Sequence, residues 1–515
     1  RLACLDALAV PHILETHYML NRRSVLATGA LATLPFAAPL SALAQAKKNN
    51  ITLALVLEPP GLDPTAGAAS SIAEITLYNI YETLTRINAD GSVTPLLAES
   101  WEVSPDLKTY TFRLKRGVKF QNGEPFNAAT VKFAFDRAAA DKSTNKDKRT
   151  FANLSTQVVD DSTVVLINKE IDPDFLFLLG QATAIMVEPK SADTNTTKPV
   201  GTGPYQLDSW NKGASITLLQ SPGFRQPAAI KIRRATFKII SDPAAQTAAL
   251  LSGDVDVFVR VTAYRNLAQF KNNSRFQVIV SGSRAKTILA MNNAKKPLDD
   301  VRVRRAISAA IDRKSVIEGA VDGFGVPIGS HYVPGALGYV DTTGVNAFNI
   351  DKAKALLKEA GVTTPLELTL TLPSPPYARQ GGEVIAAQLA KIGITAKLQN
   401  VEWAQWLSGV YGNKNYDLTI VSHVEPFDLG NYAKPDYYWG YQSAKFNALY
   451  DKIKTATRPA DRAKLLADAQ RLLAEDAANV FLFQPQWITV AHKNLRGLWK
   501  DMPIFVNDLS GLSWA

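Results

Sequence analysis

A segment near the C-terminal end, Val421–Tyr441, concentrates the side chains best suited to bind another molecule. It combines aromatic rings with acids, namely Phe427, Tyr432, Tyr437, Tyr438, Trp439, Tyr441, Glu425, Asp428 and Asp436. Their spacing follows neither the alternation of a strand nor the stripe of a helix. A carboxylate that is shielded from water needs a cationic partner, and an ammonium group of a bound molecule would serve. Glu425 and Asp428 are therefore candidates for binding, or else acids of an exposed loop.

The sequence contains no motif of a known catalytic site. Gly201-Thr-Gly-Pro204 is glycine-rich but lacks the lysine of a phosphate-binding loop, and Tyr205 follows it where that loop would open a helix. His423-Val-Glu425 is similar to part of the zinc deaminase signature, whose other half needs cysteines. The only cysteine is Cys4. We therefore expect no catalytic residue, no metal site and no cofactor.

Composition and charge are those of a globular protein with more than one domain. The 515 residues, 46% of them hydrophobic, exceed what a single hydrophobic core usually supports. A net charge of +10 would suit nucleic acid, but the basic residues are scattered and no basic run is interleaved with aromatics. The basic cluster Val301–Arg305 is expected to be the exposed edge of a helix. We expect no nucleic acid partner.

The N-terminal residues have the composition of an export signal. Arg22 and Arg23 precede an apolar, alanine-rich stretch, and Ala44-Gln-Ala46 fits a cleavage site between small residues. We expect residues 1–46 to be upstream sequence and signal peptide, with Met19 as the start and cleavage after Ala46. The export route is either ordinary secretion or the twin-arginine route, to which the match is loose. No later stretch is long enough to span a bilayer, so we expect no stable membrane insertion.

Strands and helices alternate along the rest of the chain. Apolar or alternating runs predict strands at 51–57, 109–114, 164–167, 366–372 and 394–401. Apolar stripes at helical spacing predict one helix from about 301 to 311 and another after its cap Asp351, which ends at Gly361. A helix around 383–391 between two of the strands predicts a parallel pair with a right-handed crossover. These mixed elements predict an α/β architecture in two lobes.

Seven segments, in this order, resemble the family 5 extracellular solute-binding proteins of ABC transporters, the bacterial binding proteins for oligopeptides, dipeptides, nickel and related solutes. They are Glu58–Ala66, Asn79–Ile87, Leu97–Asp136, Pro199–Asp208, Ala248–Phe258, Met291–Val321 and Asp351–Val362. None is specific by itself, but their order over most of the chain, behind an export signal, points to this one family.

The resemblance implies a type II periplasmic-binding-protein fold of the large cluster, in which two lobes hinge around a ligand cleft. Lobe I would comprise residues 47–284, including an extra subdomain at about 80–196, and a return segment at 489–515. Lobe II would comprise residues 285–488, so that the chain crosses near Arg284 and returns near Thr489. The resemblance also implies a periplasmic monomer that is not an enzyme and that delivers its solute to an ABC permease and its ATPase.

The family further implies roles for particular residues. In its dipeptide and oligopeptide members, an Asp after the strand that corresponds to 416–421 pairs with the ligand's α-ammonium, and here Glu425 or Asp428, on either side of Phe427, would replace it. Arg379 roughly aligns with an arginine that holds the ligand carboxylate. Trp403 and Trp406 follow a strand and would line the cleft or belong to the core.

Three consecutive rings, Tyr437, Tyr438 and Trp439, are the aromatics that the pattern marks as most exposed. Three adjacent rings cannot all face one core, so we expect at least one to contact ligand or the opposite lobe. In lobe I, Tyr81 and Glu58 lie in segments that border the cleft in relatives.

The predicted ligand is a peptide or peptide-like solute. Other ligands for the same class of protein are an oligosaccharide, an opine-like conjugate or a metal chelate, since the usual acidic anchor is altered. From other classes, an exported hydrolase on the same scaffold and a chaperone-like protein for extended peptides are the alternatives.

Overall fold

A computed structural model describes residues 48–515 of the chain, apart from residues 68 and 457. The predicted signal peptide, start and cleavage site lie outside the described residues. None of the helices within the described part has the length and apolar character needed to cross a membrane.

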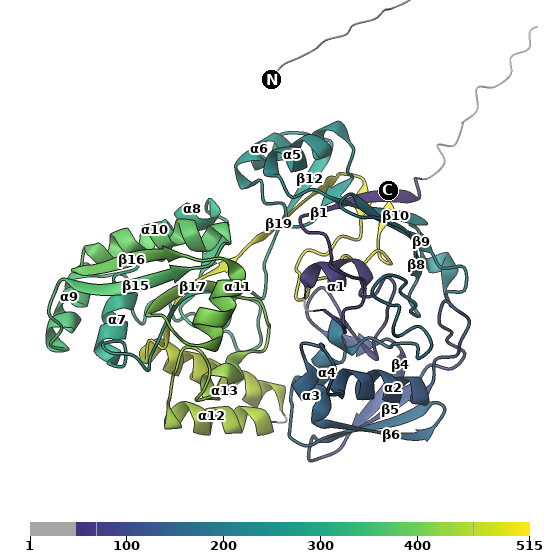
Figure 1. Ribbon diagram of the computed structural model, residues 1–515, viewed down its shortest axis with the longest axis horizontal. Coiled ribbons are helices and arrows are strands. Elements are labelled where there is room, and N and C mark those ends of the chain that lie inside the picture. The colour runs from purple at the N-terminus through teal and green to yellow at the C-terminus, as the bar shows by residue number, and fades with distance from the viewer. Residues whose placement is uncertain (1–47, 68, 457) are drawn as a thin grey trace, which may run out of the picture. The chain divides into compact units, whose positions relative to one another are not determined.

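Two large sheets organise the described chain (Figure 1). The first has the order β12 (Phe276–Ser281), β19 (Trp487–His492), β11 (Val257–Phe258), β1 (Asn50–Leu55), β10 (Arg234–Ile239), β9 (Ser215–Gln220) and β8 (Tyr205–Asn211). The second has the order β14 (Gly325–Pro327), β18 (Asn479–Pro485), β13 (Lys286–Met291), β17 (Leu418–His423), β15 (Leu366–Leu372) and β16 (Ile394–Asn400). We call the parts built on them lobe I and lobe II. The two-lobed α/β fold is thus as predicted.

The chain crosses between the two sheets twice. It leaves lobe I after β12 and enters lobe II at β13, four residues later, through residues 282–285. It returns through Gln486 alone, because β18 ends at Pro485 and β19 begins at Trp487. This return lies slightly ahead of Thr489, the position expected from the sequence.

Lobe I also carries a third sheet within residues 80–196. Its order is β4 (Ala98–Val103), β5 (Thr109–Leu114), β7 (Thr163–Asn168) and β6 (Leu154–Asp160). Two small ribbons add β2 (Thr85–Ile87) with β3 (Val93–Pro95), and β20 (Leu495–Arg496) with β21 (Ser513–Trp514). The lobe I helices are α1 (Ser70–Thr76), α2 (Ala128–Ala139), α3 (Lys148–Ala152), α4 (Phe175–Leu178), α5 (Pro243–Ser252) and α6 (Leu267–Lys271).

Lobe II has an apolar core on each face of its sheet. Along β13, Leu289 and Met291 point into one core while Ile288 and Ala290 point into the other, as the alternation of strand side chains requires. The first core is covered by α7 (Val301–Ala309), α8 (Arg313–Val321), α9 (Ile350–Glu359) and α10 (Pro376–Ala390). The second, rich in aromatic rings, includes residues of α11 (Trp403–Trp406), α12 (Ala444–Thr455), α13 (Pro459–Glu475) and the segment 429–441.

Most predicted elements form, with local differences in their bounds, and the helix expected around 383–391 already begins at Pro376. β15 and β16 pair in parallel as predicted. Helix α9 begins two residues earlier than expected, and Asn349 rather than Asp351 caps it by accepting from the Lys352 amide. Helix 301–311 ends at Ala309, and Asp312 caps a separate helix, α8.

The basic cluster at the start of α7 is not wholly exposed. Arg304 is buried, and its guanidinium donates to the carbonyls of Leu298, Asp299, Asp476 and Ala477. The interpretation of the cluster as an exposed helix edge is therefore wrong for this arginine, which secures the ends of neighbouring segments instead.

The glycine-rich segment at 201–204 has a packing role. The amide of Gly203 donates to the carbonyl of Ile80 at 2.9 Å. A Cβ at Gly201 would overlap with that carbonyl group, whereas a Cβ at the exposed Gly223 would meet nothing within 4 Å. Glycine is therefore required at 201 because another backbone lies against it.

We expect Gly201→Ala to lower the free energy of unfolding by about 3 kcal/mol, because the backbone at Ile80 cannot move aside without strain. Gly223→Ala, the matched control, should change it by less than about 0.5 kcal/mol. Urea unfolding followed by circular dichroism measures both. Equal stability of the two variants would contradict the close packing at Gly201.

Candidate functional site

Two adjoining cavities lie between residues of lobe I and residues of lobe II. The hinge cavity has a volume of about 170 Å³, and its lining includes Arg284, within the first crossing, and Trp487, next to the second. The rim cavity has a volume of about 740 Å³. Both cavities are lined by Lys146, Gln181, Glu425 and Pro426, so together they form one cleft.

Each lobe contributes a short set of segments to this cleft. Lobe I supplies residues around α1, the segment 146–153, the segment 168–183 that includes α4, and residues 502–505. Lobe II supplies the loop 424–434 after β17 and one face of α12. The hinge cavity is mainly apolar, whereas the rim cavity is lined largely by polar and charged side chains. Enclosure by both lobes is typical of a small-molecule site.

The lobe II loop is fastened by a buried ion pair. Lys286, on β13, points to the aromatic side of the sheet, and its ammonium lies 2.5 Å from Asp428 Oδ1. Only 1% of the lysine side chain and 6% of the aspartate side chain are exposed. The same ammonium donates to the backbone carbonyl of Glu425. One lysine therefore holds both ends of the turn that carries Glu425 into the cleft.

Two buried histidines complete this polar network. His331 Nε2 lies 2.9 Å from Asp428 Oδ1, and its Nδ1 lies 3.1 Å from the hydroxyl of Tyr432, which accepts from Asn479. These contacts are all satisfied when neutral His331 donates from Nε2 and accepts at Nδ1. Burial lowers the pKa of His331 to about 4, with Asp428 opposing and Lys286 adding to the effect.

The aspartate of this network stays ionised. Burial by itself raises the pKa of Asp428, but His331 and Lys286 outweigh it, so that the pKa lies well below its usual range. Burial also lowers the pKa of His423. Near neutral pH the network therefore contains one ammonium, one carboxylate and two neutral imidazoles.

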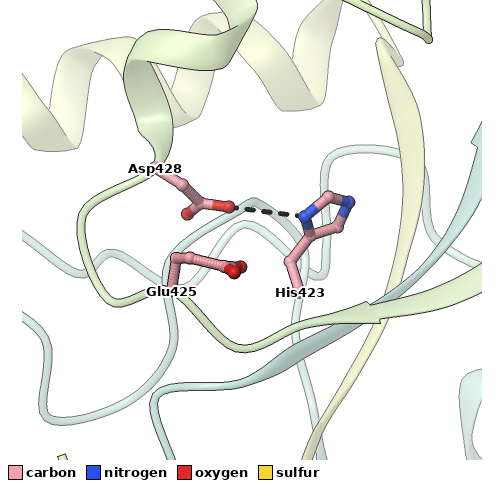
Figure 2. Close-up of side chains that lie close together, drawn as sticks. All are labelled: His423, Glu425 and Asp428. Carbon is pink, nitrogen blue, oxygen red and sulfur yellow. Dashed lines mark ion pairs between the residues drawn. The ribbon is translucent and has the colours of Figure 1, made fainter. Parts of the chain in front are cut away.

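His423, Glu425 and Asp428 bring metal-ligand atoms within 4.8 Å of one another, and Figure 2 shows their side chains turned toward a common space. His423 Nδ1 is 3.6 Å from Asp428 Oδ2. The ammonium of Lys286 already neutralises Asp428, which leaves only the charge of Glu425 uncompensated in this group. The arrangement thus suits a single positive charge better than a divalent ion.

Three of the residues predicted for the site line the cleft. Glu425 lines both cavities, while Phe427 and Asp428 line the rim cavity. The ring of Phe427 meets Phe177 of lobe I edge-to-face at 4.8 Å. Asp428 already has Lys286 as its cationic partner, which makes Glu425 the better candidate of the two for a ligand ammonium, and ligand contact by either acid stays a prediction.

Arg379, Trp403 and Trp406 line neither cavity among the described residues. Arg379, on α10, lies 3.2 Å from Glu402. Trp406 is buried and donates to Thr419 Oγ1 at 2.9 Å, which makes it part of the core. Trp403 stacks on it in parallel at 5.0 Å and is 43% exposed. Ligand contact by Arg379 and Trp403 stays a prediction.

The consecutive rings are less exposed than predicted. Tyr438 and Trp439 are fully buried in the aromatic core of lobe II, and Tyr437 is half-buried against the same core. The argument that three adjacent rings cannot share one core is wrong, because the turn at Gly440 (φ +60°) and the preceding loop are irregular. Tyr438 serves the network instead, with its hydroxyl 2.9 Å from His423 Nε2.

The two lobe I candidates lie apart from the cavities. Tyr81 is fully buried in the lobe I core. Glu58 accepts hydrogen bonds from Trp210 Nε1 and the Gly213 amide, and the Gly213 amide above all lowers its pKa. Both therefore have structural partners within lobe I.

Two residues of the site, Lys286 and Arg284, are not predicted from the sequence. Lys286 has a detectable signal, since it opens the strand Lys286–Met291, in which every other residue except Thr287 is apolar. Arg284 is expected near a crossing, but nothing in the pattern indicates that its side chain faces the cleft. Only the three-dimensional structure brings the crossing beside the loop 424–426.

The two sheets, the double crossing and the cleft define a two-lobed solute-binding protein of the type II periplasmic fold. The family model for bacterial extracellular solute-binding proteins, family 5 (Middle), matches residues 92–448. The chain belongs to this family, as the sequence resemblance predicts.

Relatives of known ligand match over nearly the whole chain. The glutathione-binding protein GsiB of Salmonella choleraesuis is 27% identical over 495 residues, which cover 91% of this chain and 95% of the relative. The solved structure of AgaA from A. tumefaciens R10 in complex with agropinic acid has a TM-score of 0.77 at 26% identity, covering 90% and 99% of the two chains. DppA of Helicobacter pylori in complex with the peptide STSA, at 24% identity and TM-score 0.77 over 90% of this chain and 98% of its own, shares the fold.

We expect Lys286→Met to reduce the free energy of unfolding by about 3–5 kcal/mol, because it leaves the Asp428 carboxylate buried without its partner. The double variant Lys286→Met/Asp428→Asn should recover part of this loss. Chemical unfolding of the three variants forms a double-mutant cycle. Additive losses in the cycle would contradict a coupled pair.

Acidification should destabilise the protein below about pH 6.5. The pKa of His331 is about 4 in the folded chain against 6.5 in the unfolded chain, so the unfolded state takes up the proton first as the pH falls. Stability from this group is complete above pH 6.5 and about 3 kcal/mol lower at pH 4. In His331→Gln, the free energy of unfolding should change less steeply with pH over this range than in wild type. In His492→Gln, most of the wild-type change with pH should remain. Unchanged slopes in both variants would contradict this assignment.

Proposed function

We propose that this protein is the periplasmic receptor of an ABC importer and that it binds a peptide or peptide-like solute in the cleft between its lobes. We infer the class of the ligand from the position and charge of Glu425. It is an exposed carboxylate that lines both cavities, and among residues 48–515 as described it forms no ion pair. A ligand ammonium would supply the missing charge.

The setting of Glu425 supports this role. Lys286 fixes its backbone through the carbonyl and also neutralises Asp428, so that neighbouring carboxylate does not compete for the ligand's charge. Binding groups that are held in place before the ligand arrives lose less conformational entropy on binding. The glutathione-binding relative GsiB is consistent with a solute that carries an α-ammonium group.

Closure of the lobes would complete the site. Phe427 on lobe II already meets Phe177 on lobe I, and Arg462 on α13 lies 2.6 Å from Asp174 of lobe I. A ligand between the lobes adds contacts that the separated lobes cannot make, so it shifts the population toward the closed form. The permease would then recognise the closed form, and the solute would be released when the lobes reopen. The monomeric state remains a prediction.

A second candidate within the same class is a non-peptide organic acid. The structure of AgaA with agropinic acid favours it, because that relative is as similar to this chain as the glutathione-binding one. Mass spectrometry of the solute that co-purifies from the native host decides between the two. A bound peptide supports the first, and a bound organic acid without peptide bonds supports the second.

Binding of the solute should raise the melting temperature and decrease the radius of gyration. At 100 times the Kd, mass action adds about 2.7 kcal/mol to the free energy of unfolding. Thermal unfolding and small-angle scattering of the protein with its identified solute measure both quantities. Stabilisation without any compaction would contradict binding by lobe closure.

Glu425→Gln should weaken binding of an ammonium-bearing solute by about 10- to 100-fold, since one charge-assisted hydrogen bond is lost. The matched control is Glu475→Gln, an exposed glutamate at the end of α13 that lines neither cavity. Calorimetry measures the affinity of wild type and of both variants for the solute and for its N-acetylated form, which lacks the ammonium charge. If acetylation and Glu425→Gln have independent, additive effects, Glu425 does not contact the ammonium.

A further inference from the structure

We propose that Arg284 forms an anion subsite at the hinge, which binds a carboxylate group of the solute. This inference rests on the proposed function and adds a second anchor to it. Arg284 lies in the crossing segment between β12 and β13 and lines the hinge cavity. It is thus neither on lobe I nor on lobe II but on the link between them.

The guanidinium of Arg284 has no anionic partner within the described chain. No carboxylate lies within 4.0 Å of it, and no hydrogen bond to it is formed by residues 48–515 as described. The nearest acid that affects it, Asp501, accepts instead from the Gly282 amide at 3.2 Å. The donors of this guanidinium are therefore not used by protein acceptors within the described residues.

Two glycines, one from each lobe, flank this guanidinium. A Cβ at Gly91 of lobe I would lie 3.2 Å from Nη2, and a Cβ at Gly335 of lobe II would lie 3.4 Å from Nη1. Both glycines have positive φ, at +83° and +85°, which other residues rarely adopt. The side chain is thereby confined in a slot whose walls belong to different lobes. An anion bound there would depend on both walls and would favour the arrangement that brings them together.

The surroundings favour a carboxylate as the anion. Burial lowers the pKa of Arg284, with Asp501 opposing, which is the effect expected for a guanidinium that lacks a close counter-ion. The planar fork of a guanidinium matches the two oxygens of a carboxylate. The other cation of the hinge cavity, Lys146, is paired with Asp147 at 3.3 Å. Glu425 lines the same cavity, so one compact solute with both an ammonium and a carboxylate would match the two free charges.

The test compares short peptides that differ only in their C-terminal group. A synthetic library of di- to pentapeptides is offered to the protein as free acids and as C-terminal amides, and the retained peptides are quantified by mass spectrometry. Wild type should retain acids over amides by about 10-fold or more. Arg284→Gln should bring the acids down to the level of the amides, and Arg284→Lys should restore part of the preference. Arg471→Gln, an exposed arginine on α13, should behave as wild type.

The outcomes separate the two proposals. If wild type retains neither library, the proposed peptide ligand is wrong, and the subsite falls with it. If wild type binds both libraries equally, or Arg284→Gln keeps the acid preference, the assignment of Arg284 is wrong while the proposed function stands. If a variant at Arg284 does not fold, labelling of wild type with phenylglyoxal tests the subsite without any substitution. A retained peptide acid should slow the modification of Arg284, and the corresponding amide should not. Equal protection by both would overturn the subsite.

Discussion

The geometry of the cleft depends on one buried ion pair, between Lys286 and Asp428. Each charge is almost completely removed from water, a state that proteins tolerate only when the partner and further hydrogen bonds are in place. His331 supplies such a bond to the carboxylate, and the Glu425 carbonyl supplies one to the ammonium. The pair thereby ties the loop after β17 to the central strand of lobe II. Glu425, which lines the cleft without an ion pair, is held by two hydrogen bonds: its carbonyl accepts from Lys286, and its carboxylate accepts from the Val424 amide at 3.2 Å.

This arrangement explains how a protein that resembles peptide binders can carry an altered acidic segment. Asp428 is conspicuous in the sequence, but its charge is paired with Lys286 within lobe II. The neighbouring Glu425 lines the cleft and has no such partner. Two acids three residues apart thus have different surroundings, and the difference comes from a lysine about 140 positions away in the chain. Two nearby aromatic residues support this pair indirectly. The hydroxyls of Tyr432 and Tyr438 form hydrogen bonds with His331 and His423, the two histidines beside the pair.

Local pattern predicts much of the fold and little of the cleft. Strand β5 follows from the alternation of Tyr110, Phe112 and Leu114, and the parallel pairing of β15 with β16 follows from the helix between them. These features depend on neighbours in the sequence. The family resemblance supplies the two lobes. By contrast, the burial of Trp439 and the partner of Asp428 depend on contacts between distant segments, which no periodicity records. The burial of Arg304 is not predicted for the same reason, since its carbonyl partners at 476 and 477 follow the end of another helix.

The unequal lengths of the two crossings limit how the lobes can move. One link has four residues, 282–285, whereas the other is Gln486 alone between β18 and β19. A single residue spans only about 3.5 Å even when extended, so sliding of one sheet past the other is blocked and rotation about the short link remains. Under rotation, points close to the axis are displaced little and points far from it are displaced most. Solutes of different length would then be accommodated at the outer end of the cleft, while the chemistry recognised near the axis stays the same for all of them.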